Sequence, residues 1–266
     1  MAATHFPLRE VQVNRYITPF REGGSLPALV AADDGFEYVL KFRGAGQGTK
    51  ALMADLLGGE LARMAGLLVP ELVIAAVDPA FGLSEPDEEI QDLLKASEGL
   101  NLGVHFLNGA LTLEPAATQL TPLLASKIVW LDYLLTNVDR TPRNSNLLWW
   151  KGEVWLIDHG ACFLFHHQGY EGWEAAAAKP FDAIQLHLLL PYASELQAAH
   201  EELLPRLLEA DLGGLVQQLP SDWCTASGEP EDPAKIRDSY LQFIRHRLQQ
   251  MPLLLTHLAH VRASSV

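Results

Sequence analysis

The fold is decided by residues 137–160, which have the sequence NVDRTPRNSNLLWWKGEVWLIDHG. Within this stretch Asp139 and Asn144 stand five residues apart, and a second carboxylate, Asp158, comes shortly before a glycine. Carboxylate and amide oxygens suit Mg²⁺, which usually takes one or two carboxylates together with waters and substrate phosphates. The ordered trio therefore predicts a site that holds Mg²⁺ on the phosphates of a nucleotide while orienting an acceptor hydroxyl.

A predicted hairpin brings the two ends of this stretch together. Two apolar, β-favouring runs, Leu147–Trp150 and Val154–Ile157, flank a tight turn at Lys151-Gly152. The register that this turn sets would place Asn144 and Asp158 close enough to share one cation, and a turn shifted by one residue would still leave them neighbours. The alternative is an ordinary surface hairpin with polar flanks.

Length and composition indicate a folded protein of one large domain or two small lobes. The chain has 266 residues, of which 48% are hydrophobic and 20% charged, and its formal net charge is −14. It contains no lysine- or arginine-rich run, which disfavours a nucleic-acid partner and an anionic membrane surface. An acidic protein that binds a nucleotide must supply positive charge locally, so a few basic residues should matter greatly.

The cysteines and the N-terminus favour a cytoplasmic location. Cys162 and Cys224 are the only cysteines, and Met1–Glu10 has no features of a signal peptide. No uncharged apolar run approaches the roughly 18–20 residues that a membrane-spanning helix needs.

The order of predicted elements indicates an α+β class with two lobes. The first third is rich in predicted strands and carries one helix, at about residues 50–65, whereas the pattern is helical from about residue 115. We expect a β-rich nucleotide-binding lobe at residues 1–107 and a helical catalytic lobe at residues 108–266, which is the layout of a protein-kinase-like fold. A hinge strand at Val104–Leu107 would offer backbone groups of His105 and Phe106 to an adenine ring.

Lys41 is the candidate ligand for the phosphates. It lies within the apolar strand Tyr38–Phe42 and needs an anionic partner, because an unpaired buried ammonium is costly. Glu60 interrupts an otherwise apolar face of the following helix and is the expected partner, with Asp55 as a substitute. Such a pair fixes the lysine so that it holds phosphates. The alternative places Lys41 on a solvated face of the hairpin and Glu60 at the rim.

Two glycine-bearing turns are candidates for a phosphate cradle. The first, Gly23-Gly24-Ser25, joins two early strands, and the second, Gly44–Gly48, follows Lys41 and opens a helix. Neither matches a complete G-x-G-x-x-G or G-x-x-x-x-G-K-[ST] motif. We assign the phosphate contacts to Gly24 and Ser25 and interpret Gly44–Gly48 as a flexible connection.

With these residues placed, the chain resembles the HipA-like kinases, a bacterial branch of the protein-kinase-like fold related in layout to the phosphatidylinositol kinases. The resemblance rests on Val39–Phe42, the helix that carries Glu60, Asp139–Asn144 and Ile157–Gly160. It implies ATP and Mg²⁺ as cofactors. It also implies that the four polar residues of the site divide the work: Asp139 would orient and deprotonate the acceptor hydroxyl, Asn144 and Asp158 would hold Mg²⁺, and Lys41 would contact the ATP phosphates.

The departures from better-known kinases narrow the function. No His-Arg-Asp triplet precedes the catalytic position, and His159 replaces the phenylalanine of an Asp-Phe-Gly motif. Arg140 or Arg143 would offset charge in the transition state or serve structure alone. The leading hypothesis is a Ser/Thr protein kinase of the HipA-like type. The alternatives are a small-molecule phosphotransferase, for which Glu171, Glu174 and Asp182 could form an acidic acceptor pocket, and an ATP-binding pseudokinase.

The partners are less closely defined. The acceptor is an unidentified protein or small molecule, and neither direct nucleic-acid binding nor a membrane is expected. The larger HipA-type toxins form complexes with a small DNA-binding antitoxin, but nothing in this shorter, acidic chain demands such a partner. Nucleotidyl transfer to a protein is a further alternative. A metal hydrolase built on His159, His166 and His167 is disfavoured, because their spacing lacks the H-E-x-x-H pattern.

Overall fold

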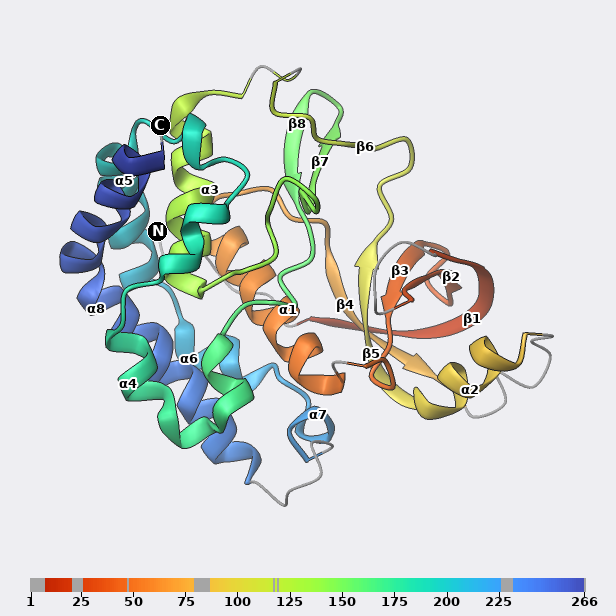
Figure 1. The fold of residues 1–266 in the computed structure, drawn as a ribbon. Helices are drawn as coiled ribbons and strands as arrows, with labels where there is room; N and C mark the ends of the chain where they lie inside the picture. Colours follow the sequence, from red (N-terminus) through yellow and green to blue (C-terminus); the bar gives the residue numbers. More distant parts are fainter. Residues whose placement is uncertain are drawn as a thin grey trace.

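A computed structural model describes residues 8–20, 26–46, 48–78, 87–116, 118, 120–225 and 232–265. Figure 1 shows strands gathered at one side of the molecule and most helices at the other, with helix α1 between them. The expected α+β class is confirmed.

Five of the described strands close into a small barrel in the order β1-β2-β3-β5-β4. They are β1 (Arg9–Pro19), β2 (Ala28–Ala32), β3 (Glu37–Lys41), β4 (Leu72–Val77) and β5 (Gly99–His105). All neighbours are antiparallel except β1 and β4, which are parallel. Alternate side chains such as Val30, Tyr38 and Leu40 fill the interior and are fully buried. Closure leaves these strands few free edges.

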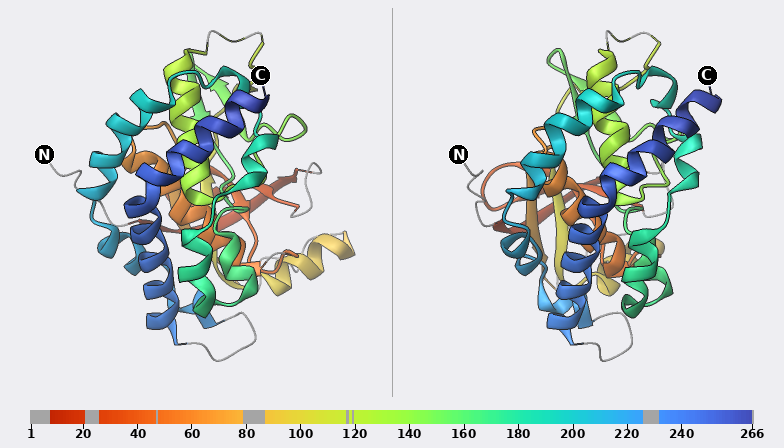
Figure 2. Two further views of the ribbon diagram at one scale, coloured as in Figure 1. Left: turned by 60° about the vertical axis from the view of Figure 1, so that its left-hand side comes forward. Right: turned by 90° about the vertical axis from the view of Figure 1, so that its left-hand side faces the viewer.

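The helical part is built around two long helices, α3 (Pro122–Leu135) and α8 (Pro233–Ser265). Figure 2 shows α8 running along the outside of this part, where it contacts α4 (Trp173–Ala178) and α5 (Leu196–Leu208). The other helices are α1 (Gly48–Met64), α2 (Glu88–Ala96), α6 (Leu212–Gln217) and α7 (Ser221–Thr225). Within the described residues, none of these helices combines the length and the apolar character that a bilayer crossing requires.

The apolar core does not divide at the predicted lobe boundary. One cluster fills the barrel, but α1 residues such as Met53 and Leu57 belong to a larger cluster that also contains Trp130 of α3 and Leu248 of α8. The outer face of β4 joins the same cluster through Ile74. Helix α1 comes from the N-terminal third of the chain and yet packs with the C-terminal helices, so it ties the barrel to the helical part.

The predicted hairpin is present, with the predicted register. Strand β7 (Leu147–Trp150) pairs with β8 (Glu153–Leu156), and Trp150 lies opposite Glu153. The turn residues Lys151 and Gly152 have φ angles of 50° and 86°, which is the type I′ conformation that suits a two-residue hairpin. Strand β6 (Leu111–Thr112) adds to β7 and completes a three-stranded sheet.

Candidate active site

Two cavities meet between the barrel and the helical part. The larger has a volume of about 430 Å³ and is lined by the polar residues Asp139 and Asn144 together with the first turns of α1. The smaller, of about 290 Å³, is mainly apolar and is lined by residues such as Val104. Lys41 and Asp158 line both cavities, so the two form one cleft with this pair at the junction.

Lys41 lies at the end of β3 between two carboxylates. Its Nζ is 2.5 Å from Oδ2 of Asp55 and 2.7 Å from Oδ1 of Asp158. The predicted pairing with Glu60 is wrong, because Glu60 instead contacts Nε of Arg63 at 3.3 Å. Positions 55 and 60 are separated by about 140° around a helix axis, so only one of them can face the strand. Asp55, the substitute partner, holds the lysine.

The three charges shift one another's pKa. Burial alone lowers the pKa of Lys41, but attraction by Asp158 and Asp55 outweighs burial and raises it. Burial raises the pKa of Asp55. For Asp158, burial acts upward and Lys41 acts downward more strongly, so the pKa of this carboxyl is lowered. Asp158 is therefore ionised at neutral pH, as a cation ligand must be.

Asp139 lies on the loop after α3 and is oriented by two amides. Nδ2 of Asn144 donates to its Oδ2 at 2.7 Å, and Nδ2 of Asn146 donates to the same oxygen at 3.1 Å. Its backbone N–H donates to Oδ1 of Asn137 at 3.0 Å. Asn146 was not predicted from the sequence, although its position two residues after Asn144 was a usable signal.

The structure brings the predicted metal ligands to one cavity. Asn144 and Asp158 line the polar cavity together with Asp139. Because the amide nitrogen of Asn144 is bonded to Asp139, its carbonyl oxygen is the group left for a cation. Within the described residues, no group of three or more His, Cys, Asp or Glu side chains could hold a metal by itself. One carboxylate, one amide oxygen and substrate phosphates are a donor set that fits Mg²⁺.

A buried ion pair packs against the loop that carries Asp139. Nε of Arg140 lies 2.6 Å from Oδ2 of Asp132, and neither side chain has any exposed surface. Asp132 also accepts a hydrogen bond from Asn137 at 2.9 Å and contacts Nε2 of His187 at 2.9 Å. Burial raises the pKa of Asp132, but Arg140 and His187 reverse this and keep it well below its usual range. Arg140 therefore stabilises the loop and does not line the polar cavity.

His159 connects this ion pair to Lys41. Its backbone N–H donates to Oδ1 of Asp55 at 2.6 Å, and its Nε2 is 3.4 Å from Nη2 of Arg140. Burial and then the nearby Arg140 charge lower the pKa of His159 to about 3, so the ring is neutral. The ring packs against Gly58 of α1, where a Cβ atom would lie 2.6 Å from the His159 Cβ. A continuous series of contacts therefore joins β3, α1 and the loop that carries Asp139.

The apolar cavity contains the predicted hinge, with one correction. His105 and Phe106 line it, but their backbone N–H groups already donate to the carbonyls of Glu71 and Glu37, at 2.8 and 2.9 Å. A base bound in this cavity would have to use carbonyl oxygens or the backbone of Leu107, which also lines it. The His105 ring lies edge-on against the rings of Phe36 and Tyr38. The prediction concerned only the backbone groups of His105 and does not depend on this ring.

The two glycine-bearing turns predicted as phosphate cradles differ in what the structure shows of them. Gly24 and Ser25 lie outside the described residues, so their assignment to the phosphates stays a prediction. In the second turn, Ala45 and Gly48 line the polar cavity, and α1 begins at Gly48 with a φ angle of 60°. Ala45 and Gly48 are therefore part of the cavity wall.

This cleft, with its lysine, loop aspartate, asparagine and second aspartate in one place, defines a protein-kinase-like phosphotransferase site. The structure of the Helicobacter pylori proinflammatory kinase CtkA is similar over 96% of this chain and 99% of that one, with a TM-score of 0.55 and 11% identity, a likeness that shows the fold alone. Two structures of the Golgi casein kinase, one with Mn and ADP bound, cover 91% and 92% of this chain and 73% and 74% of theirs, at 12% and 11% identity. Their TM-scores of 0.42 and 0.38 are too low to support an argument.

The sequence model of the HipA-like kinase family matches residues 13–252 of this chain. The chain belongs to the HipA-like kinase family. No curated protein sequence matches it.

Proposed function

We propose that this chain is an ATP- and Mg²⁺-dependent kinase that transfers a phosphoryl group to a serine or threonine hydroxyl of a protein in the cytoplasm. The observation that carries the proposal is the convergence of Lys41, Asp139, Asn144 and Asp158 on one polar cavity that opens into an apolar one. A nucleotide has the matching shape, with an apolar base at one end and charged phosphates at the other. In this arrangement the barrel is the nucleotide-binding lobe and the helical part the acceptor lobe.

The polar residues of the site divide the work of the proposed reaction. Asp158 and Asn144 would hold the cation, and Lys41 would bind phosphate oxygens, while Asp55 keeps the Lys41 ammonium in place. Asp139, oriented by Asn144 and Asn146, accepts the proton of the acceptor hydroxyl. When bound, Mg-ATP supplies the phosphoryl group and its leaving group. Because phosphoryl transfer depends mainly on positioning and electrostatics, these few polar groups suffice.

The acceptor is proposed to be a protein hydroxyl because the acidic pocket expected for a small-molecule acceptor has no support. In the described part of the chain, Glu171, Glu174 and Asp182 are exposed and do not line the polar cavity. Asp182 pairs with His257 of α8 at 3.0 Å. These carboxylates therefore belong to the solvated face of the helical part.

The test compares the wild type with Asp139→Asn and with Asp92→Asn, a matched control at an exposed carboxylate on α2. Each protein is incubated with Mg²⁺ and γ-labelled ATP, with a mixed peptide library as acceptor, and ADP release and label transfer are followed. Removing the general base should lower turnover about 10²–10⁴-fold, and the control should match the wild type.

Three outcomes count against the proposal. Equal turnover by the wild type and Asp139→Asn would remove Asp139 from the chemistry. ATP binding without turnover by any protein would favour a pseudokinase. The absence of ATP binding would end the nucleotide hypothesis altogether.

A further inference from the structure

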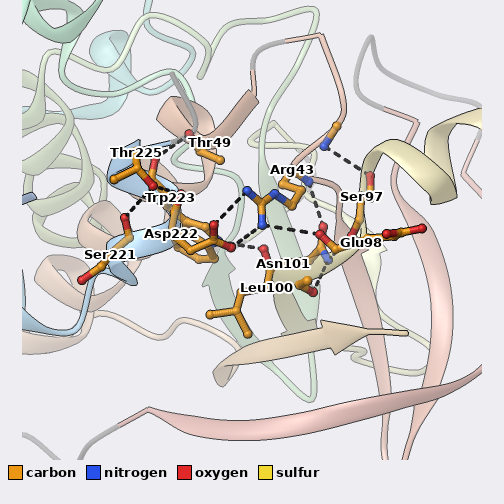
Figure 3. A network of polar contacts seen from close by, with 12 residues as sticks. Arg43, Thr49, Ser97, Glu98, Leu100, Asn101, Ser221, Asp222, Trp223 and Thr225 are labelled. Atoms are coloured by element: carbon orange, nitrogen blue, oxygen red, sulfur yellow. Dashed lines mark hydrogen bonds and ion pairs between the residues drawn. The ribbon is translucent and has the colours of Figure 1, made fainter. Parts of the chain in front are cut away.

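The short helix α7 (Ser221–Thr225) belongs to the C-terminal third of the chain but makes polar contacts with Arg43, Thr49 and Leu100, far earlier in the sequence (Figure 3). We propose that α7 is a clamp that fixes Lys41 relative to Asp55, and that Arg43 and Asp222 are positioning residues for phosphoryl transfer. This inference rests on the proposed function, because it concerns the geometry of the same lysine.

The first half of the clamp is the ion pair of Arg43 and Asp222. Nη1 of Arg43 contacts Oδ2 of Asp222, and Nη2 contacts Oδ1 at 3.2 Å, so both carboxylate oxygens are engaged. Arg43 is further fixed by its backbone N–H, which donates to the buried Oδ1 of Asn101 at 2.9 Å. The Arg43 side chain is 15% exposed and that of Asp222 is 46% exposed, so solvent screens the pair in part.

The second half of the clamp is Trp223, which is fully buried. Its indole Nε1 donates to the carbonyl of Leu100 on β5 at 2.8 Å, and its own carbonyl accepts a hydrogen bond from Oγ1 of Thr49 at 2.7 Å. Thr49 lies in the first turn of α1. Two adjacent residues of α7 therefore hold the end of β3, strand β5 and the start of α1 at once.

The clamp is anchored to the helical part from behind. Arg237 of α8 donates through Nη2 to the carbonyl of Leu219 at 2.6 Å and to Oγ of Ser221 at 2.9 Å. Helix α7 also contacts α8 directly. Helix α7 therefore connects the turn after β3 to α8, the longest of the described helices.

The clamped positions are close in sequence to the two groups that must meet. Lys41 precedes Arg43 by two residues, and Asp55 follows Thr49 by six residues on the same helix, a rise of about 9 Å. The contact of Lys41 with Asp55 forms only if β3 and α1 keep their relative position. No lining residue of the apolar cavity belongs to α1 or α7, and Val39 and Val104 lie four residues along the chain from the clamped positions Arg43 and Leu100, so the clamp should affect the placement of the phosphates more than the binding of the base.

A glycine makes room for the clamp. Gly99 has a φ angle of 95°, and a Cβ atom there would lie 2.9 Å from Nη1 of Arg43 and 3.6 Å from Oδ2 of Asp222. A side chain at this position would press on the ion pair, and the left-handed backbone conformation also favours glycine.

The test uses charge reversal and exchange in the full chain: Arg43→Asp, Asp222→Arg, and the double variant that restores opposite charges. Each single reversal places like charges together and should lower kcat about tenfold, while KM for ATP should change less than about threefold. The double variant should recover kcat to within about threefold of the wild type. The control reverses Glu202, whose ion pair with Lys127 at 2.6 Å lies away from the clamp, and it should leave kcat unchanged.

A second measurement does not depend on turnover. Amide hydrogen exchange should become faster in residues 41–60 of the single reversals, return to the wild-type rate in the double variant, and stay unchanged in α5. Unchanged exchange in residues 41–60, or a kcat that the reversals do not lower at a temperature where all variants are folded, would overturn the inference. If the wild type itself shows no turnover, the proposed function fails, and the exchange data alone decide whether α7 holds β3 and α1 together.

Discussion

At Lys41 an ammonium group that is 15% exposed lies between two carboxylates, and its partners show how the site is specified residue by residue. Burial of a lysine in an apolar strand required an anion, but the choice of Asp55 over Glu60 depended on the rotation of α1 about its axis. The same rotation turns Gly58 toward His159 and Gly59 toward Leu72. Two adjacent helical glycines thus face different neighbours, which makes them a natural pair for a test.

We predict that Gly58→Ala destabilises the protein although alanine is the better helix former. The new Cβ would lie 2.6 Å from the Cβ of His159, which cannot move without displacing Asp158. Overpacking of this kind costs about 1–3 kcal/mol, more than the roughly 1 kcal/mol that alanine contributes in a helix. In Gly59→Ala the nearest atom is the end of a flexible leucine at 2.8 Å, so a smaller loss is expected. Urea unfolding gives the free energy of unfolding of both variants. Equal values would show that the loop carrying His159 moves aside without an energetic cost.

At the scale of elements, the end of α3 determines where the catalytic loop begins. Thr136, with a φ angle of 56°, is the left-handed C-cap of α3. The last carbonyls of the helix, those of Tyr133 and Leu134, accept hydrogen bonds from Arg247 of α8. The same guanidinium donates to the carbonyl of Lys179 at 2.7 Å and is fully buried. Burial lowers its pKa to about 10, which still leaves it charged at neutral pH.

We predict that Arg247→Met destabilises the protein by about 2–4 kcal/mol, because it leaves buried carbonyls without donors and each hydrogen bond to a charged group contributes about 1.5–3 kcal/mol. Arg245→Met, at an exposed position two residues away on the same helix, should change stability by less than about 0.5 kcal/mol. The free energy of unfolding in urea separates the two variants. If Arg247→Met left the free energy of unfolding unchanged, the C-cap Thr136 would be enough to hold the end of α3.

At the scale of the whole molecule, burial of histidines in the shared core makes stability depend on pH. Burial lowers the pKa of His159, packed under Lys41, to about 3, and it lowers that of His166, bonded to Tyr240, to about 3 as well. In the unfolded chain these rings take up protons near pH 6.5, whereas in the folded protein they stay neutral. Stability is therefore lost as pH falls below about 6.5, until the folded protein is also protonated.

We predict that the free energy of unfolding falls by about 2–3 kcal/mol between pH 7.0 and pH 5.5, since each histidine reaches its full slope of about 1.4 kcal/mol per pH unit only below the unfolded pKa of about 6.5. Asp132, whose pKa is lowered, adds nothing in this window, because its stabilisation is lost only below the pKa of an unfolded aspartate. Asp55, whose pKa is raised, acts in the opposite direction and makes the slope less steep. Burial also lowers the pKa of His187, which adds to the slope. Urea unfolding at the two pH values gives the slope, and His166→Phe should reduce the loss of stability by about 1 kcal/mol. A flat profile would contradict the burial of neutral histidines.

The sequence by itself determined the local features. Lys151-Gly152 set the hairpin and its register, and the order of Lys41, Asp139, Asn144 and Asp158 predicted the chemistry of the site. These features depend on turn conformation, periodicity and residue type within short stretches, all of which are visible without a fold.

Only the tertiary structure decided which distant groups meet. The partner of Lys41, the pairing of Asp132 with Arg140, and the contact of α7 with Arg43 join residues from different elements. The physical reason is that a buried charge dictates the need for an opposite charge, whereas the rotation and packing of helices in a common core dictate which residue supplies it.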